Sequence, residues 1–467
     1  MNSDKIKVLF LNPPGKEIYI RDYYCSKVSK AYYLPQPVDL LTQTSFFSKD
    51  QFACKVMDAI AEKLSFEESV QQVIDFQPDY IITQCGSVSY QEDNLFFEHL
   101  IRKIEDVKIF STGDLFLESP IQYLSKTIWL KGVITDFFDD GVKQLIHQNY
   151  EGIHGLTYKY NGEIIERASS SKKKEIDLNI PQHHLFKNDL YRMPFVNKYP
   201  MATVLTNYAC PYPCTFCIMS FLNFKQRSTE SIKKELLRLK ELGTKYIYFS
   251  DQTFFVNSKV TSEILDFMIN ENLGFNWVCF SRVDVLNADK LLKMKQAGCN
   301  TIMFGVEWAD DELCKKYKKQ YTVAQVKETF SLAKKVGIKR MGTFLIGVPE
   351  QSRESIRNTV DFAIEIDADY ASFNVAVPRA QTSFREEALD LGLISEDEKQ
   401  MDQSGSFIAM GTGKVSAEEL MKLKKEAYRK FYLRPSYIWK RVYSLRNLEE
   451  LKTHTREAFY VLKNIFA

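Results

Sequence analysis

The chain has 467 residues, of which 45% are hydrophobic and 26% charged, a composition that predicts a globular protein with room for two or three domains. Its 62 Lys and Arg residues against 60 Asp and Glu give a net charge of +2, so the charge gives no reason to expect a nucleic-acid partner. No apolar run approaches the ~18 residues of a transmembrane helix, and the N-terminus does not resemble a signal peptide. Together with nine cysteines, this predicts a cytoplasmic protein in a reducing compartment.

Residues 1–150 alternate short apolar runs with helical patterns, which predicts an α/β domain with a parallel sheet. Five such strands with helices between them predict a flavodoxin-like, Rossmann-type doubly wound sheet. We expect strands at 7–11, 52–57, 80–83, 107–111 and 132–135, and helices near 38–48, 66–75, 91–103 and 142–147.

Doubly wound sheets bind ligands beyond the carboxyl ends of their strands. The predicted loops at that edge are polar and contain small residues, which would let a large flat ligand approach the backbone. A long loop at 21–33 follows the first strand and is rich in polar, aromatic and thiol groups; it could overhang a ligand or pack as a surface loop. The candidate ligand-binding residues of this edge are Asn12, Pro13, Gly86, Ser87, Ser89, Gly113 and Gly141.

Residues 151–195 are expected to form a hairpin and a linker. Asn161-Gly162 is typical of a tight hairpin turn between the strand-like runs on either side. The Ser- and Lys-rich stretch 169–174 then predicts a solvated joint before the next domain.

Three cysteines, Cys210, Cys214 and Cys217, are spaced C-x3-C-x2-C on one short predicted loop. Three thiolates can hold three irons of a [4Fe–4S] cluster and leave the fourth iron open to a substrate molecule. Structural zinc is the alternative, but zinc usually takes two closely spaced ligand pairs, and no second pair lies nearby in the sequence. The spacing therefore favours an iron–sulfur cluster with an open iron.

From 196 to 395 the chain again alternates strands and helices, with about six βα units predicted in all. Three charged residues directly follow predicted strands: Asp251, Arg282 and Glu307. If the strands form a parallel barrel, these side chains lie at its active edge, although charged residues at strand ends often only cap helices or face water.

The cysteine spacing, with Phe216 before the third cysteine, resembles the radical S-adenosylmethionine (radical SAM) superfamily. The run Thr343-x-Leu345-x-Gly347-x-x-Glu350 resembles a second motif of that superfamily, with Thr in place of its first Gly. The resemblance implies a partial TIM barrel of (β/α)6 type, a [4Fe–4S] cluster on the three cysteines, and SAM bound at the open iron and cleaved to a 5′-deoxyadenosyl radical.

The resemblance also implies roles for individual residues in binding SAM. Phe216 would cover a bound heterocycle, Glu307 would approach the aminoacyl group of SAM, and Leu345 would face the adenine. Arg282 could meet a carboxylate, and Asp251 is a further candidate. The superfamily's Gly-Gly-Glu motif is absent, and Phe249-Ser-Asp-Gln-Thr-Phe254 stands in its place.

That replacement, the order of the two domains and the Asn-Pro-Pro after the first strand resemble the cobalamin-binding radical SAM enzymes, over residues 5–395. This family comprises methylases and anaerobic cyclases, and it implies cobalamin over the edge of the N-terminal sheet. The Asp-x-His-x-x-Gly signature for a lower histidine ligand is missing, and the glycines of the last two loops depart from the family pattern. A domain of this shape can also persist as a scaffold without cofactor.

Residues 396–467 read as a helical extension, with helices expected at 417–432, 437–446 and 448–466. Basic and aromatic residues alternate here, and such a face either packs on the barrel or touches a membrane surface that carries a lipid-like substrate. The residues of this basic aromatic face are Arg434, Tyr437, Trp439, Lys440, Arg441, Tyr443 and Arg446.

The function that this pattern favours is a cobalamin-dependent radical SAM methyltransferase acting on an unactivated carbon. The alternatives are an oxidoreductase or cyclase of the same subgroup without methyl transfer, and a non-catalytic metal- or corrin-binding module. The expected partners are a small-molecule or lipid-like substrate and an electron donor, either a reductase or a flavodoxin or ferredoxin.

Overall fold

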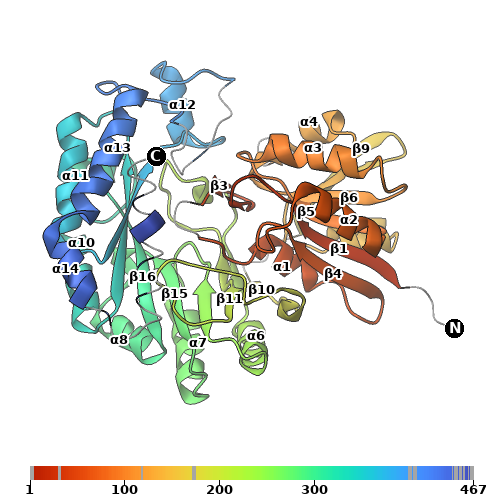
Figure 1. Ribbon diagram of the computed structural model, residues 1–467, viewed down its shortest axis with the longest axis horizontal. Helices are drawn as coiled ribbons and strands as arrows, with labels where there is room; N and C mark the ends of the chain where they lie inside the picture. Colours follow the sequence, from red (N-terminus) through yellow and green to blue (C-terminus); the bar gives the residue numbers. More distant parts are fainter. Residues whose placement is uncertain are drawn as a thin grey trace. The chain divides into compact units, whose positions relative to one another are not determined.

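The computed structural model describes residues 5–29, 33–116, 119–170, 175–397, 402 and 408–443, with single residues and short pieces beyond Tyr443. The chain divides into two compact units (Figure 1). Unit 1 comprises Met1–Ser29 and Leu34–Tyr191, and unit 2 comprises Lys30–Tyr33 and Arg192–Ala467. The mixed α/β class predicted from the sequence is confirmed in both units.

Unit 1 is built on a seven-stranded sheet in the order β4-β1-β5-β6-β7-β8-β9. The first five strands are parallel, and β8 and β9 join the edge in antiparallel orientation. The strands of unit 1 are β1 (Ile6–Asn12), β2 (Tyr19–Ile20), β3 (Lys27–Val28), β4 (Phe52–Asp58), β5 (Tyr80–Gln84), β6 (Lys108–Thr112), β7 (Leu130–Ile134), β8 (Leu156–Tyr160), β9 (Glu163–Arg167) and β10 (Glu175–Ile176). The helices are α1 (Val38–Thr44), α2 (Phe66–Phe76), α3 (Tyr90–Leu100), α4 (Pro120–Lys126) and α5 (Gly141–Ile146).

Successive side chains of β1 point to opposite faces of this sheet, and both faces are buried. Leu9 and Leu11 pack into a core with α2, α3 and α4. Phe10 points to the other face, where its ring meets Phe47, just after α1, at 5.5 Å between centroids. Because each face carries its own helices, the parallel strands are buried on both sides, as such sheets require.

The hairpin at 156–167 belongs to unit 1 and is not part of a linker. Thr157 of β8 pairs with Val133 of β7, so the hairpin extends the sheet that the sequence predicted to end at β7. The expected boundary at residue 150 therefore falls inside a compact unit, and the division lies near Tyr191 instead. The prediction also missed α4, whose first turn begins with Pro120.

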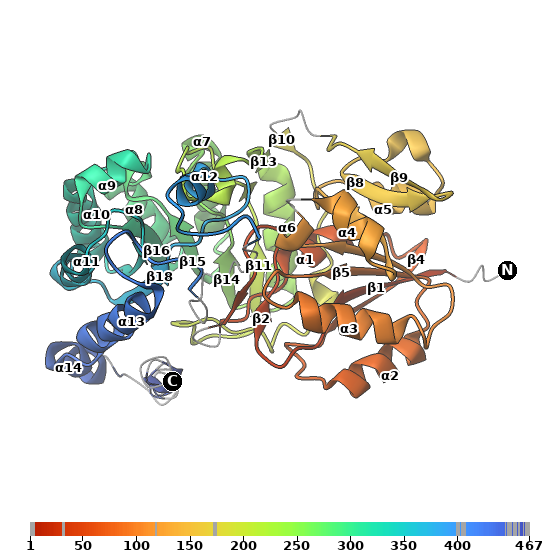
Figure 2. The ribbon, with the colours of Figure 1, turned by 90° about the horizontal axis from the view of Figure 1, so that it is seen from above.

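Unit 2 contains a six-stranded parallel sheet in chain order, β11-β14-β15-β16-β17-β18. Its helices cover one side of the sheet, where α8, α10, α11 and α13 follow one another (Figure 2). The strands of unit 2 are β11 (Met201–Val204), β12 (Asn207–Tyr208), β13 (Lys225–Arg227), β14 (Tyr246–Phe249), β15 (Asn276–Ser281), β16 (Cys299–Glu307), β17 (Lys339–Ile346) and β18 (Tyr370–Val375). The helices are α6 (Thr229–Glu241), α7 (Ser258–Asn270), α8 (Ala288–Gln296), α9 (Asp311–Lys316), α10 (Val323–Lys335), α11 (Arg353–Glu365), α12 (Ser383–Asp390), α13 (Ala417–Tyr432) and α14 (Pro435–Tyr443).

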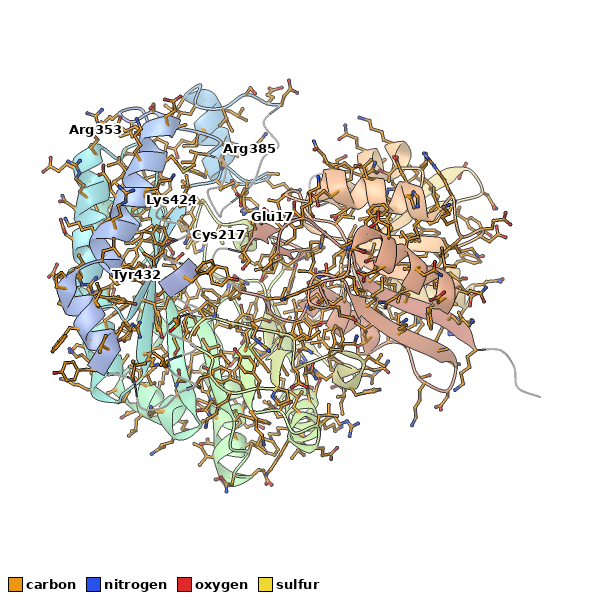
Figure 3. All side chains as sticks on the ribbon, viewed as in Figure 1. Glu17, Cys217, Arg353, Arg385, Lys424 and Tyr432 are labelled. Carbon is orange, nitrogen blue, oxygen red and sulfur yellow. The ribbon has the colours of Figure 1, made fainter. Side chains whose placement is uncertain are left out.

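Helix α13 covers the free edge of this sheet at β18. The hydroxyl of Tyr432 accepts a hydrogen bond from the Ala371 backbone N–H at 3.0 Å and donates one to the Ala371 carbonyl at 2.7 Å. Arg353 of α11, labelled with Tyr432 in Figure 3, is ion-paired to Glu419 at the other end of α13. An uncovered edge strand would be open to pairing with other chains, so α13 completes the unit.

Most of the predicted basic aromatic face packs against this end of the sheet. Tyr437 donates a hydrogen bond to the Asp369 carbonyl, and Arg441 lies 4.0 Å above the Tyr370 ring. Lys440 is paired with Asp367 and Asp369, whereas Trp439 and Tyr443 are 63% and 71% exposed. Arg446 and most of the helix expected at 448–466 lie outside the described residues. Among the residues that the structure describes, no helix has the length and apolar character needed to cross a membrane.

Replacing Tyr432 by Phe should destabilise unit 2 by about 1–3 kcal/mol, because the edge N–H and carbonyl of Ala371 lose their partner. Urea unfolding followed by circular dichroism measures the change. Tyr443→Phe, on the exposed side of α14, is the matched control and should leave the transition in place. Equal stability of the two variants would contradict this account of the edge.

Candidate active site

The three cysteines lie on a loop of unit 2 that leaves β12 and ends in a short helical turn at Ile218–Ser220. Cys214 is buried, while Cys210 and Cys217 are partly exposed. The loop turns tightly, with a backbone hydrogen bond from Cys217 N–H to the Cys214 carbonyl, and Ala209 at its start has a left-handed φ of 61°. The sequence prediction of one short loop carrying all three thiols agrees with this geometry.

Asp251, after β14, anchors the beginning of the cysteine loop. Its Oδ1 accepts the backbone N–H of Thr206 at 2.7 Å and that of Asn207 at 3.3 Å. Its Oδ2 accepts the Asn207 side-chain amide at 2.9 Å and the Thr206 hydroxyl. Burial raises the pKa of Asp251 to about 7, although these hydrogen bonds act in the opposite direction. Asp251 is fully buried and holds the start of the loop, and its predicted contact with a cofactor remains a proposal.

The far side of the loop is fixed by two later elements. Thr215 donates its N–H to the Tyr317 carbonyl and accepts, through its own carbonyl, the N–H of Phe384 at the start of α12. The ring of Phe216 packs edge-on against Trp308 at 5.5 Å between centroids. Phe216 is therefore a partly buried anchor of the loop, which leaves its predicted contact with a heterocycle as a proposal.

Two buried cations flank Cys214. Arg282, after β15, directs one guanidinium N–H at the Cys214 sulfur at 3.7 Å and is ion-paired to Asp284 at 2.8 Å. Its plane stacks on the Tyr212 ring at 3.7 Å. Lys319 is 6% exposed and pairs with Glu307 at 2.7 Å. The strand-end charges predicted from the sequence thus gather beside the cysteine loop, with a lysine that the prediction did not include.

Burial and charge act in opposite directions on the thiols. Burial raises the pKa of Cys217 to about 12 and also raises the pKa of Cys214. The charges of Lys319 and Arg282 act in the opposite direction on Cys214, but burial has the larger effect. Metal ligation requires thiolates, and nearby cations favour the deprotonated form. In the described part of the chain, no three His, Cys, Asp or Glu side chains are gathered tightly enough to hold a metal ion.

The second predicted motif divides between the core and a peripheral ion-pair network. Leu345 is 6% exposed and packs in the core of unit 2. Gly347 has a φ of 92°, and its N–H is held by the Gln351 side chain. Glu350 accepts the Tyr317 hydroxyl at 2.7 Å and pairs with Lys316, which lowers the pKa of this carboxyl. The contact of Leu345 with an adenine remains a proposal.

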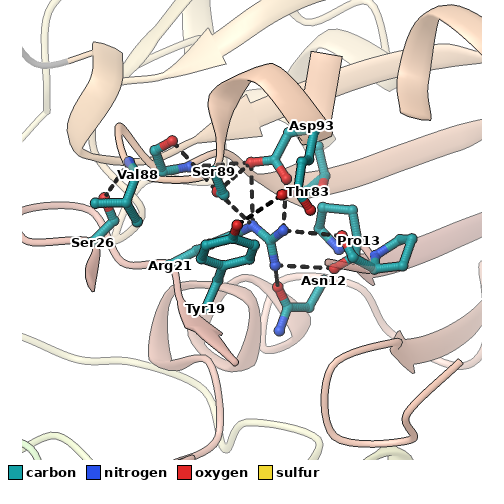
Figure 4. Close-up of polar contacts among 12 residues, drawn as sticks. Asn12, Pro13, Tyr19, Arg21, Ser26, Thr83, Val88, Ser89 and Asp93 are labelled. Carbon is teal, nitrogen blue, oxygen red and sulfur yellow. Dashed lines mark hydrogen bonds and ion pairs between the residues drawn. The ribbon is translucent and has the colours of Figure 1, made fainter. Parts of the chain in front are cut away.

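In unit 1, the carboxyl edge of the sheet is covered by the segment Tyr19–Val28, here called the cover segment. At its centre is Arg21, which is buried and paired with Asp93 at 2.6 Å (Figure 4). Arg21 also donates to Ser89, to the Asn12 side chain and to the carbonyl of Pro13. Asn12, Pro13 and Ser89 therefore contact the protein's own arginine, where the sequence predicted a ligand.

The cover segment also fills the neighbouring strand ends. Ser26 bonds to Asp114, which also accepts from Ser87, and the Tyr23 hydroxyl donates to the Thr135 carbonyl. A Cβ on Gly86 would lie 2.6 Å from the Ser26 Cβ. The corresponding atoms on Gly113 and Gly141 would meet backbone carbonyls at 1.8 and 2.2 Å. These glycines permit close packing of the chain on itself. Of the two arrangements expected for the long loop after β1, the structure shows the one in which the loop packs, here over the edge of the sheet.

Buried acceptors lie beneath the cover segment. Asp39 receives the Gln84 side-chain amide at 3.0 Å, but its Oδ1, the Gln84 Oε1 and the Thr112 Oγ1 have no hydrogen-bond partner. Burial raises the pKa of Asp39 well above its usual range and that of Asp22, in the cover segment, to about 6. Buried polar atoms without a hydrogen-bond partner are uncommon in folded proteins and mark an edge suited to a polar group that can pair with them.

Comparison with known proteins identifies the family. Residues 204–363 match the model of the Radical SAM superfamily. An uncharacterized methyltransferase of Pyrococcus horikoshii is 30% identical over 408 residues, which cover 85% of this chain and 87% of that protein. The chain therefore belongs to the radical SAM superfamily.

Two further likenesses are to an anaerobic cyclase and to the solved structure of a cobalamin-dependent enzyme. The anaerobic magnesium-protoporphyrin IX monomethyl ester cyclase of Cereibacter sphaeroides is 23% identical over 412 residues, covering 82% of this chain and 65% of that protein. The solved structure of the cobalamin-dependent S-adenosylmethionine radical enzyme OxsB, with aqua-cobalamin and SAM bound, superposes with a TM-score of 0.70 at 15% identity. It covers 99% of this chain and 72% of that chain, and at this identity it shows a shared fold.

Replacing Asp251 by Ala should destabilise unit 2 by about 2–5 kcal/mol and lower the iron bound after anaerobic reconstitution. The cause is that the N–H groups of Thr206 and Asn207 lose their buried acceptor. Thermal unfolding and an iron assay measure the two effects, with exposed Asp289→Ala as the control. An Asp251→Ala protein with normal stability and iron content would refute the anchoring role.

Proposed function

We propose that this chain is a radical SAM enzyme whose Cys210, Cys214 and Cys217 hold a [4Fe–4S] cluster. The observation that carries the proposal is the cysteine loop itself, which is tethered at one end by Asp251 and at the other by Tyr317 and Phe384. The sequence offers three closely spaced thiols and no second ligand pair near them, which suits a cluster with one open iron better than a closed zinc site. All nine cysteines are free thiols, which suits a reducing compartment.

The residues beside the loop fit SAM. When bound, the cluster supplies the electron that cleaves SAM. Glu307 ends β16 with a left-handed φ of 63°, a conformation that is uncommon for non-glycine residues. Its carboxylate, 12% exposed as a side chain, is the group that we assign to the SAM amino group. Arg282 stabilises Cys214 through its N–H.

We propose methyl transfer as the reaction, because the relative that shows the family is named a methyltransferase and matches 87% of its length. Unit 1 supports the proposal through its five parallel strands, whose spatial order 2-1-3-4-5 is that of flavodoxin-like domains. Cobalamin, which the OxsB structure holds, would carry the methyl group. The corrin periphery is rich in amides, which can both donate to and accept from the polar atoms of Asp39 and Gln84 that have no hydrogen-bond partner.

In this chain cobalamin would meet the cover segment first. The strand-end residues Asn12, Pro13, Gly86, Ser87, Ser89, Gly113 and Gly141 lie behind it or pack against backbone, so direct corrin contacts with them require Tyr19–Val28 to move. Hydroxocobalamin should therefore change the hydrogen exchange of residues 19–28. Unchanged exchange at saturating corrin would contradict this placement.

A second candidate reaction is cyclisation or another oxidation without methyl transfer, which the likeness to the anaerobic cyclase of Cereibacter sphaeroides favours. In both cases we propose a small-molecule or lipid-like substrate and a small reductase, flavodoxin or ferredoxin as electron donor. The chemistry of the loop is common to both, so the fate of the SAM methyl group separates them.

Cys214→Ala should remove the visible absorption of the reconstituted cluster and reduce SAM cleavage to background, because thiolate-to-iron charge transfer and cluster binding both require this ligand. Cleavage is followed as 5′-deoxyadenosine by chromatography. Unit 1 should remain folded. Cys54→Ala, on the sheet of unit 1, is the control and should leave both signals intact. A Cys214→Ala protein that still cleaves SAM would show that the cluster ligands are assigned wrongly.

Methyl-labelled SAM distinguishes the two reactions. With reductant, hydroxocobalamin and the substrate pool of the native cell extract, the methyltransferase should place the label in a product other than S-adenosylhomocysteine or methionine. The measurement is mass spectrometry of the anaerobic reaction. Substrate turnover without label in any product would favour the cyclase-type reaction.

A further inference from the structure

A single lysine in a run of exposed lysines is turned into the protein. Lys315, Lys316 and Lys318 are exposed, whereas Lys319 is 6% exposed. The residues on either side, Lys318 and Gln320, have left-handed φ angles of 53° and 62°. The N–H of Lys319 also bonds to the Cys314 carbonyl at the end of α9. Such backbone conformations are costly for non-glycine residues, so the turn is built to bury this side chain.

The buried ammonium of Lys319 meets one carboxylate and two aromatic rings. Its Nζ lies 2.7 Å from Glu307 Oε1 and sits over the rings of Phe216 and Tyr321 at 5.6 and 5.5 Å from their centroids. The carbonyl of Lys319 accepts an N–H of Arg282 at 2.6 Å. Through these contacts one residue is joined to Glu307, to the aromatic residue of the cysteine loop, and to the arginine that reaches Cys214.

The space for the ion pair is left by Gly305. A Cβ on this residue would lie 2.8 Å from Glu307 Oε1 and 3.0 Å from Lys319 Nζ. The pairing of β16 with β17 shifts register between Gly305 and Glu307, which turns the Glu307 side chain toward Lys319. The register shift at the end of β16, the missing side chain of Gly305 and the inward orientation of Lys319 therefore all favour the ion pair between Lys319 and Glu307.

The charges of Lys319 and Glu307 explain how this ion pair would affect the binding of SAM and the reduction of the cluster. A buried carboxylate without a counter-charge is costly and would take up a proton, which would remove its attraction for an ammonium group. A fixed positive charge close to an iron–sulfur cluster stabilises its more negative, reduced form. Lys319 supplies both effects from one atom.

Resting on the proposed function, we propose that Lys319 is a positioning residue: it fixes Glu307 for the amino group of SAM and raises the reduction potential of the cluster on Cys210, Cys214 and Cys217. The first effect acts through Glu307, while the second is a direct effect of charge. The effect of Lys319 on SAM affinity should therefore disappear when Glu307 is replaced, whereas its effect on the cluster potential should remain.

The test is a double-mutant cycle on the full-length, anaerobically reconstituted protein with Lys319→Met, Glu307→Gln and the double variant. SAM affinity is measured by equilibrium binding and the cluster potential by a redox titration followed by EPR. Lys319→Met should weaken SAM binding by about thirtyfold or more, as expected when one partner of a buried charge pair is removed. Lys319→Met should also shift the potential to a more negative value. Lys319→Arg should retain most of both properties, and exposed Lys318→Met is the matched control.

In the Glu307→Gln background, Lys319→Met should have little further effect on SAM affinity but should still lower the potential. If Lys319→Met alone does not fold or load iron, the same comparison is made between Glu307→Gln and the double variant, which buries no unpaired charge. The proposal would be overturned if Lys319→Met left both the SAM affinity and the cluster potential unchanged. It would also be overturned if the cluster potential did not differ between Glu307→Gln and the double variant. A wild-type protein that takes up no cluster would instead refute the proposed function and leave the Lys319–Glu307 pair as a structural feature.

Discussion

The position of the cysteine loop depends on one buried carboxylate. Asp251 receives both the Thr206 and Asn207 N–H groups and so fixes the point where the chain leaves the sheet toward Cys210. At the other end the loop is held by backbone hydrogen bonds from Thr215 to Tyr317 and from Phe384 to Thr215. The backbone is therefore tethered before Cys210 and again between Cys214 and Cys217, which holds the loop that carries the thiols in place. The parallel sheet supplies the anchors from the ends of successive strands.

Much of the fold followed from hydrophobic periodicity. The parallel strands of unit 1 are buried on both faces, and those of unit 2 are buried against its helices, so both read as short apolar runs that a pattern of alternating strands and helices detects well. The hairpin at 156–167 was recognised from its Asn-Gly turn, but its attachment to β7 was not, because pairing with a distant edge leaves no local signal. Helix α4 is short and begins at a proline, so its pattern is too brief to register.

The residues of the candidate site could be predicted only in part from the sequence. Spacing identified the three cysteines, and strand-end position identified Arg282 and Glu307, which the structure brings close to the loop. The same criterion selected Asp251, but strand-end position does not reveal whether a carboxylate faces a ligand or the chain itself. Lys319 was hidden in a lysine-rich run, since only the left-handed φ angles of its neighbours turn it inward. In unit 1 the strand ends predicted to bind a ligand are covered by the buried Arg21–Asp93 pair, which joins residues 72 positions apart in the sequence and leaves no local signal.

The central claim is that the cysteine loop leaves one iron of a cubane open to SAM. Mössbauer spectroscopy of the iron-57-reconstituted protein, recorded with and without SAM, tests this claim most directly. The account predicts four irons per chain and one iron whose isomer shift changes when SAM is added, while the other three stay constant. A protein that binds zinc alone, or a cluster whose spectrum does not respond to SAM, would contradict it.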